Sequence, residues 1–259
     1  MKFLCTICAR SGSKGLKNKN FLKINKKNYK LIENEKDLDQ WIKNAEEVGE
    51  VAIDTETTSL DPHQADLVGI SLSNDIGKAC YIPIGHIRGN NLKEKNVIKK
   101  LKPVLEDLSI KKIGQNIKFD YIILYHIGIH MTSMQDTMLM SYVLDAGKNR
   151  HNMDTLSEIH LGHKTIQFKD LVGTGKKQIS FNEVDINSAK DYAAEDADIT
   201  FRLYKIFNKN LKIEKLSNIY EIFEKPLIKI LANMEISGIK LDTNILNFLS
   251  EKFQKKLIY

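Results

Sequence analysis

Two carboxylates stand one residue apart at the end of an apolar run, in the stretch "VAIDTETTSL" at residues 51–60. The apolar, partly β-branched residues before Asp54 predict a buried strand. Alternate side chains of a strand point to the same face, so Asp54 and Glu56 should lie side by side. Like charges near a protein core raise the free energy of the folded state unless something compensates them. The pair therefore predicts a site for a cation.

Further acidic residues occur in two helical patterns downstream. Asp120 follows "GQNIKF" at the start of one predicted helix. In "DYAAEDAD", Tyr192 and Asp196 are four residues apart, on the same face as an apolar row that continues to Ile206, so Asp196 should point inward. Asp198 is rotated by about 200° from Asp196, at about 100° per residue, and we expect it to face solvent.

These acids favour a hard divalent cation. Carboxylates from separate elements, with no need for cysteine or histidine, are the oxygen ligands that Mg²⁺ and Mn²⁺ select. Two such ions about 3.5 to 4 Å apart could activate a water molecule and stabilise the leaving oxygen in phosphodiester hydrolysis. A tyrosine hydroxyl one helical turn from a ligand could hold that water, whereas its intrinsic pKa near 10 makes it a poor base at neutral pH.

Composition gives a globular class and little more. A chain of 259 residues with 42% hydrophobic and 28% charged residues can bury a sizeable core. No apolar run reaches the roughly 20 residues of a membrane span, so we expect a cytoplasmic protein with no membrane partner. The three cysteines, Cys5, Cys8 and Cys80, have no framework spacing and predict reduced thiols.

The net charge of +6 is unevenly distributed. Residues 1–30 carry nine basic residues and no acidic one, so the other 229 residues sum to −3. The overall charge is thus a property of the basic leader and does not by itself predict that the main domain binds DNA.

The elements that must position the acids follow from the periodicity. An amphipathic helix with an Asn34 cap precedes three strand-like runs, which we expect to form an antiparallel meander. Helix-connected elements follow, including a short strand at "IKKIGQN" and a helix over 184–208. This order predicts an α/β protein with a mixed sheet and helices packed on it.

Three segments resemble the motifs of a known family. In chain order they are "AIDTETTSL", "GQNIKFD" and "YAAEDAD". They resemble the exonuclease motifs of the 3′→5′ proofreading domain of bacterial DNA polymerase I, a DEDD exonuclease. The resemblance runs from about residue 31 to the end of the sequence. It implies an RNase H-like fold, with a mixed five-stranded sheet flanked by helices and a helical C-terminal stub.

The resemblance also implies roles for individual residues. Asp54, Glu56 and Asp196 hold the tighter of two Mg²⁺ or Mn²⁺ ions, Asp54 bridges to the second ion and Asp120 holds it. Tyr192 marks the Tyr subclass of this family. Leu60 and Phe168 correspond to positions that wedge against and stack on the terminal bases, although plain core packing is an alternative for both. The positions near the phosphates and the 3′ terminal nucleotide are Gln115, Asn116 and Arg150.

Some features have simpler interpretations. Asp136 fits the same neighbourhood, but we predict that it caps a helix. The histidines do not form a ligand spacing, and we expect structural roles for them. The stretch "GTGKK" could touch a phosphate backbone, but a surface loop is the preferred interpretation.

Three segments are expected, of which the first is not an independent domain. Residues 1–30 form the basic leader, whose "ICARSGSKGLKNKN" resembles the opening of cytidylyltransferases that activate sialic-acid-type sugars and is interpreted as a fusion remnant. Residues 31–213 form the exonuclease domain. Residues 214–259 resemble the truncated start of a family-A polymerase domain, without a nucleotide-adding site. An apolar stripe near the C-terminus, including Phe248 and Phe253, could bind a separate polymerase subunit.

The resulting hypothesis is a metal-dependent 3′→5′ exonuclease that releases 5′-mononucleotides from single-stranded or frayed DNA ends, in replication and repair. Two alternatives remain at this point. One is an RNA 3′ exonuclease like ribonuclease D. The other is a catalytically idle DNA-binding or docking module of a split polymerase.

Overall fold

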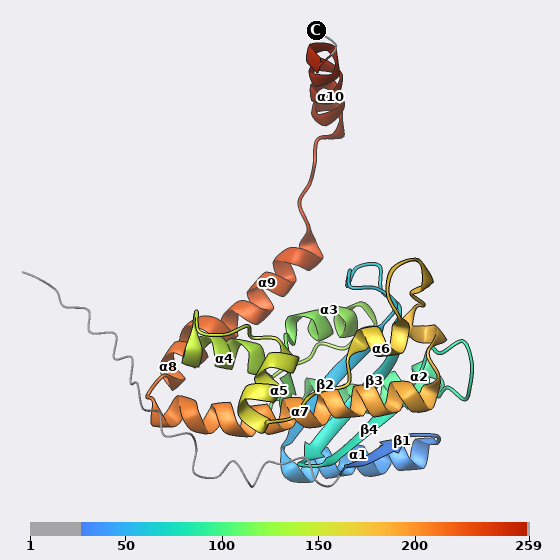
Figure 1. Cartoon of the computed structure of the whole chain (residues 1–259), viewed down its shortest axis with the longest axis vertical. Coiled ribbons are helices and arrows are strands. Elements are labelled where there is room, and N and C mark those ends of the chain that lie inside the picture. The colour runs from blue at the N-terminus through green and yellow to red at the C-terminus, as the bar shows by residue number, and fades with distance from the viewer. Residues whose placement is uncertain (1–26, 258–259) are drawn as a thin grey trace, which may run out of the picture.

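The computed structural model of the chain describes residues 27–257 (Figure 1). In this part six strands form one mixed sheet in the order β1-β4-β3-β2-β5-β6. The strands are β1 (Asn28–Leu31), β2 (Glu50–Thr57), β3 (Leu67–Asp75), β4 (Lys78–Pro83), β5 (Lys111–Gly114) and β6 (Met134–Asp136). The antiparallel meander of β2, β3 and β4 is confirmed, whereas β1, β5 and β6 each pair in parallel with their neighbour.

The expected count of five strands is wrong for the described residues, which form six. Both outer strands are short and lack an apolar pattern: β1 is "NYKL" and β6 is "MQD". Their backbone hydrogen bonds to β4 and β5 give them strand geometry, so a pattern of buried side chains could not reveal them.

The helices cover both faces of the sheet (Figure 1). They are α1 (Glu35–Val48), α2 (Glu94–Glu106), α3 (Lys118–His126), α4 (Thr137–Asp145), α5 (Met153–Leu161), α6 (Phe168–Val172), α7 (Ile186–Ile213), α8 (Ser217–Ile219), α9 (Lys225–Ser237) and α10 (Thr243–Leu257). Helices α1, α2 and α3 pack with the larger core on one face, and α7 crosses the other face together with α4 and α5.

Local capping fixes where the main helices start. Asn34 accepts a hydrogen bond from the backbone of Asp37 and caps α1, as predicted. Asp185 does the same for α7, accepting from Asn187 and Ser188. From there α7 runs for 28 residues across the sheet, so one helix carries both a core-packing stripe and the acidic segment 195–198.

The C-terminal helices extend from the sheet. Helix α9 buries Ile228 and Ala232 against the larger core, and the buried Tyr220 hydroxyl accepts a hydrogen bond from the backbone of Asp136. Helix α10 stands away from the rest of the molecule and buries none of its side chains (Figure 1). No helix in the described part has the length and apolar character needed to cross a membrane.

Candidate active site

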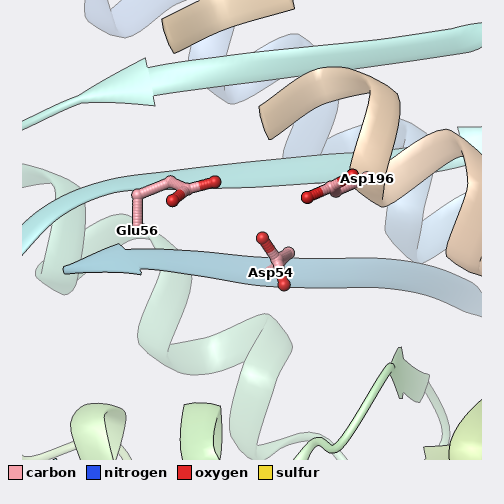
Figure 2. A group of neighbouring side chains, drawn as sticks. All are labelled: Asp54, Glu56 and Asp196. Carbon is pink, nitrogen blue, oxygen red and sulfur yellow. The ribbon is translucent and has the colours of Figure 1, made fainter. Parts of the chain in front are cut away.

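Three carboxylates converge above the sheet. Asp54 and Glu56 project from β2 and Asp196 projects from α7 toward them (Figure 2). One oxygen from each group lies within 4.8 Å of the others. The predicted same-face placement of Asp54 and Glu56 is confirmed, and so is the inward direction of Asp196. We call these three residues the carboxylate cluster.

The end of β2 is where the sheet becomes irregular. Glu56 pairs with Gly69 of β3, and the register shifts between Glu56 and Thr57. Such irregularities bend a strand and redirect its side chains, and they are common beside active sites. The acidic pair therefore lies at the last regular positions of β2.

Burial and mutual repulsion raise the pKa values of the cluster. Burial raises the pKa of Asp54 well above its ordinary value, and the charge of Asp196 raises it further. Burial also raises the pKa of Glu56, with a further rise from Asp54. The pKa of Asp196 rises to about 8, mainly by burial, although hydrogen bonding to Tyr192 opposes this. No cationic side chain of the described residues lowers any of the three.

The donor set fits a divalent cation. All three groups are carboxylates, and Oε1 of Glu56 is buried without a hydrogen-bond partner among the described residues. An unpaired buried oxygen is costly, and a hard cation coordinated by oxygens removes that cost. Residues 27–257 contain no other group of three or more His, Cys, Asp or Glu side chains with ligand geometry.

Asp120 lies beside the carboxylate cluster and outside it. Its Oδ1 accepts hydrogen bonds from the backbone N–H of Thr55 (2.9 Å) and from the Thr55 hydroxyl (2.6 Å). Burial and then the charge of Asp54 raise its pKa, while the Thr55 hydrogen bonds lower it. The charge of Asp54 therefore acts on Asp120, while two hydrogen bonds from Thr55 hold the Asp120 carboxylate against β2.

Tyr192 lies one turn before Asp196 on α7 and is half-buried. Burial raises the pKa of its hydroxyl above 10, and the neighbouring carboxylates add to this. The group therefore stays protonated at neutral pH and can donate a hydrogen bond, but it cannot act as a base. Its ring contacts those of Phe168 and Phe181.

The residues expected to contact a substrate lie at the surface. Leu60 is 92% exposed, which excludes core packing, and Phe168 is 41% exposed with its ring stacked on Phe181. Arg150 and Asn116 are exposed as well. Gln115 contacts the protein itself: its side-chain N–H donates to the backbone carbonyl of His151 (2.8 Å). This hydrogen bond holds the loop that carries Arg150.

Asp136 caps a helix, as predicted. Its carboxylate accepts hydrogen bonds from the backbone of Met138 and Leu139 at the start of α4. It also accepts from the backbone of Asn116, which has a positive φ of 60°, and of Ile117. Asp136 thus fixes the turn between β5 and α3, and so the start of the helix that carries Asp120.

The prediction that Asp198 faces solvent is wrong. Asp198 is fully buried and accepts hydrogen bonds from Arg202 (2.9 Å), the Gly77 backbone (2.8 Å) and the Tyr29 hydroxyl (2.9 Å). Helix α7 is covered on this side by β1 and the β3–β4 turn, which the helical projection did not include. The Arg202 at i+4 was a usable signal, because that spacing allows an ion pair.

Glu195 is a second buried acid that the sequence reasoning missed. It forms an ion pair with Lys27, lies 3.0 Å from Nε2 of His163 and accepts a hydrogen bond from the Ile166 backbone (2.7 Å). We call Glu195 and Asp198 the paired acids. Both tie neighbouring segments to α7 within a turn of Asp196.

Comparison with models of protein families shows to which family these residues belong. Residues 29–212 match the model of a family described as 3′–5′ exonuclease. The chain belongs to this 3′–5′ exonuclease family. It is thus a hydrolase domain, and the resemblance deduced from the three motifs is confirmed. The resemblance of the leader to cytidylyltransferases lies outside the described residues, and the family match begins at residue 29.

Curated relatives of this domain are bacterial DNA polymerases I. The chain is 45% identical over 233 residues to DNA polymerase I of Rhizobium leguminosarum, covering 82% of this chain and 23% of that protein. It is 38% identical over 237 residues to that of Pseudomonas aeruginosa, covering 89% and 26%. The chain thus spans about a quarter of the length of these relatives.

Solved structures share the fold. NrnC of Brucella melitensis with bound Mg²⁺ has a TM-score of 0.57 and 25% identity, covering 73% of this chain and 86% of that one. M. smegmatis Pol1 has a TM-score of 0.69 and 18% identity, covering 87% and 35%. Escherichia coli RNase D has a TM-score of 0.59 and 16% identity, covering 80% and 51%. The RNase H-like fold is therefore confirmed.

Proposed function

We propose that the chain is a metal-dependent exonuclease that hydrolyses phosphodiester bonds at the 3′ ends of single-stranded or frayed DNA and releases 5′-mononucleotides. The observation that carries this proposal is the carboxylate cluster, whose charges no cation of the described residues neutralises. Such an activity suits the removal of mispaired ends during DNA replication and repair in the bacterial cytosol.

Two divalent cations, Mg²⁺ or Mn²⁺, are the proposed cofactors. They supply an activated water and stabilise the leaving oxygen. Asp54, Glu56 and Asp196 are the proposed ligands of one ion, and the unpartnered Oε1 of Glu56 supports this. Asp120 is the proposed ligand of the second ion, and Asp54 is proposed to be shared by both ions. The effect of the Asp54 charge on the pKa of Asp120 supports this.

Tyr192 is proposed to position the attacking water. Its hydroxyl stays protonated and lies one helical turn from Asp196, so it can donate a hydrogen bond without taking a proton. The phenol would therefore not accept the proton of the attacking water; a bound cation would lower the pKa of that water, so that its proton is lost to solvent.

Exposed apolar side chains are proposed to grip the strand end. Leu60 and Phe168 offer faces for base contact that do not depend on sequence. Arg150 and Asn116 are exposed for phosphate contact, and Gln115 holds the loop that carries Arg150. Contacts of this kind hold a strand without reading its bases.

DNA is the preferred substrate because the identity to DNA polymerase I reaches 45%. RNA 3′ ends are the second candidate, since RNase D shares the fold. Rates on matched DNA and RNA oligonucleotides distinguish the two. Against a catalytically idle module, all four acids and Tyr192 are present.

The boundaries 1–30, 31–213 and 214–259 remain proposals, as does a separate polymerase subunit as a partner for α10. Pulling down partners with and without residues 214–259 tests the second point. The exposed apolar side chains of α10, including Phe248 and Phe253, motivate it.

The experiment for the proposed function uses a 3′-labelled single strand with Mg²⁺, with and without a chelator. We expect chelator-sensitive release of labelled mononucleotide, and none from the Asp54→Ala variant. Undiminished release by Asp54→Ala, or release that a chelator does not change, would contradict the proposal.

A further inference from the structure

A chain of buried hydrogen bonds leads from the sheet toward the aromatic side chains beside the carboxylate cluster. The hydroxyl of Tyr81, on β4, lies 2.7 Å from Nε2 of His86, and Nδ1 of His86 lies 3.2 Å from the carbonyl oxygen of Val184. A carbonyl can only accept, so Nδ1 carries the hydrogen and Nε2 accepts from Tyr81. His86 therefore joins β4 to the segment before α7.

The near end of this chain touches the strand pair that holds Glu56. A Cβ atom at Gly69 would lie 2.2 Å from the Tyr81 hydroxyl, so Tyr81 occupies the space above Gly69. Gly69 is the residue that pairs with Glu56 between β2 and β3. Burial and then the charge of Glu56 raise the pKa of Tyr81, so its hydroxyl remains a donor.

The far end supports the aromatic side chains. Val184 follows a single 3₁₀ turn, Phe181–Glu183, in which Phe181 is buried. The ring of Phe181 lies 6.1 Å from the rings of His86 and Tyr192. It also stacks on Phe168 with an interplanar angle of 4°. The turn that His86 holds is thus the support beneath both Tyr192 and Phe168.

The orientation of His86 is itself fixed. The side chain of Asn91 accepts from the backbone N–H of His86 (3.0 Å) and donates to its carbonyl oxygen (2.7 Å). The next residue, Ile87, donates to the backbone carbonyl of Asn182 (2.9 Å), inside the same 3₁₀ turn. The backbone around His86 is therefore fixed by Asn91 and Asn182, and its imidazole is fixed by Tyr81 and Val184.

We infer that His86 is a positioning residue for the exonuclease reaction: through Val184 and Phe181 it fixes the ring of Tyr192 and the stacking face of Phe168. This inference rests on the proposed function, which assigns Tyr192 to the attacking water. His86 itself does not belong to the carboxylate cluster. Its substitution should therefore reduce turnover by displacing Tyr192 while the cation ligands stay in place.

The test is a double-mutant cycle on the full chain with Mg²⁺ and a 3′-labelled single strand. We expect His86→Ala to lower kcat about tenfold, because a displacement of about 1 Å in a reacting geometry can cost more than that. In the Tyr192→Phe background the same substitution should lower kcat by less than about twofold, since the hydroxyl that it displaces is already absent. Equal losses in both backgrounds would overturn the inference.

Two further variants separate positioning from general destabilisation. Ile82→Val alters the same strand on its other face, in the larger core, and should leave kcat unchanged at temperatures where the protein is folded. Tyr81→Phe removes only the hydroxyl that His86 accepts from, and should lower kcat less than His86→Ala does. If His86→Ala does not fold, Tyr81→Phe takes its place in the cycle with Tyr192→Phe, with the same criterion.

A readout independent of activity distinguishes this inference from the proposed function. In protein labelled with fluorotyrosine, the ¹⁹F resonance of Tyr192, assigned by Tyr192→Phe, should shift or broaden in His86→Ala and not in Ile82→Val. An unchanged resonance overturns the positioning role even in an active enzyme. Absence of chelator-sensitive release by the wild type overturns the proposed function, while a shifted resonance still supports the link between His86 and Tyr192.

Discussion

The carboxylate cluster and the paired acids both include residues from one turn of α7, and they differ in what neutralises their charges. The paired acids have cations of the protein as partners: Arg202 for Asp198, and Lys27 for Glu195. Asp196 lies between them in sequence but points into the carboxylate cluster, where it meets only other acids and Tyr192. A buried charge that has a partner stabilises structure, whereas one without a partner is available to a ligand.

The difference in chemistry follows from which element faces each side of the helix. Asp198 faces β1 and the β3–β4 turn, which supply Tyr29 and a backbone N–H. Asp196 faces β2, which supplies Asp54 and Glu56. Two acids that are two residues apart on α7 thus differ in role: Asp198 holds neighbouring segments, and Asp196 belongs to the carboxylate cluster.

The largest effect is expected on activity when the carboxylate cluster is broken. Asp54→Ala should lower kcat by roughly 10³-fold or more, because it removes a ligand shared by the proposed ions, and several kcal/mol of charge stabilisation are at stake. Its unfolding free energy in chelator should not fall, since the substitution removes repulsion. Single-turnover rates and urea unfolding measure the two quantities, and a variant that is inactive only because it is unfolded would contradict this comparison.

Breaking a paired acid should have the opposite profile. Asp198→Ala leaves the buried Arg202 without this acid and should reduce the free energy of unfolding by about 3 to 5 kcal/mol. Asp191→Ala is the matched control, because Asp191 lies on the same helix but is exposed, and it should change stability by less than about 0.5 kcal/mol. Urea unfolding of the two variants measures this difference. Equal free energies of unfolding would contradict a stabilising role for the buried pair of Asp198 and Arg202.

Divalent cations should stabilise the wild type and not the variant of the carboxylate cluster. At about 100 times its dissociation constant, a cation that binds only the folded state adds about 2.7 kcal/mol. Thermal unfolding with increasing Mn²⁺ should therefore show a rising midpoint for wild type and for Asp191→Ala, and a flat one for Asp54→Ala. A rise of the same size in Asp54→Ala would place the binding elsewhere.

A further expected effect is a dependence of the free energy of unfolding on pH in chelator. The folded pKa of Asp196, about 8, exceeds the ordinary value of 3.8, so the folded state holds protons that the unfolded state releases. The stabilisation is therefore complete below about pH 4 and is lost as pH rises toward 8, by up to about 1.4 kcal/mol per pH unit for each proton held. Urea unfolding across this range, with and without Mg²⁺, checks it; in chelator, stability that rises with pH contradicts the sign.

Sequence patterns predicted the strands with apolar alternation and missed those without it. The meander of β2, β3 and β4 follows from their buried residues, whereas β1 and β6 owe their geometry to backbone pairing with β4 and β5. Sequence could not supply this pairing, because it depends on which distant strand has a free edge.

For the site, spacing predicted the directions of Asp54, Glu56 and Asp196 correctly. It failed for Asp198 because a helical projection assumes one buried face, whereas α7 is covered on two sides. A structural role was expected for His86, but its partners Tyr81 and Val184 could not be predicted, since they come from segments whose contact only the fold defines. Local periodicity thus predicts the direction of a side chain, but not the residues that it contacts in the fold.

The decisive experiment for the carboxylate cluster titrates Mn²⁺ and follows two quantities in parallel. They are Mn²⁺ binding, measured by electron paramagnetic resonance, and mononucleotide release from a 3′-labelled single strand. In the wild type we expect release to rise as Mn²⁺ is bound and to stop with chelator. In Asp54→Asn, folded and without this charge, we expect both binding and release to be lost together. Release that persists in Asp54→Asn, or Mn²⁺ binding unaffected by the substitution, would contradict the assignment of the carboxylate cluster as the cation-dependent centre.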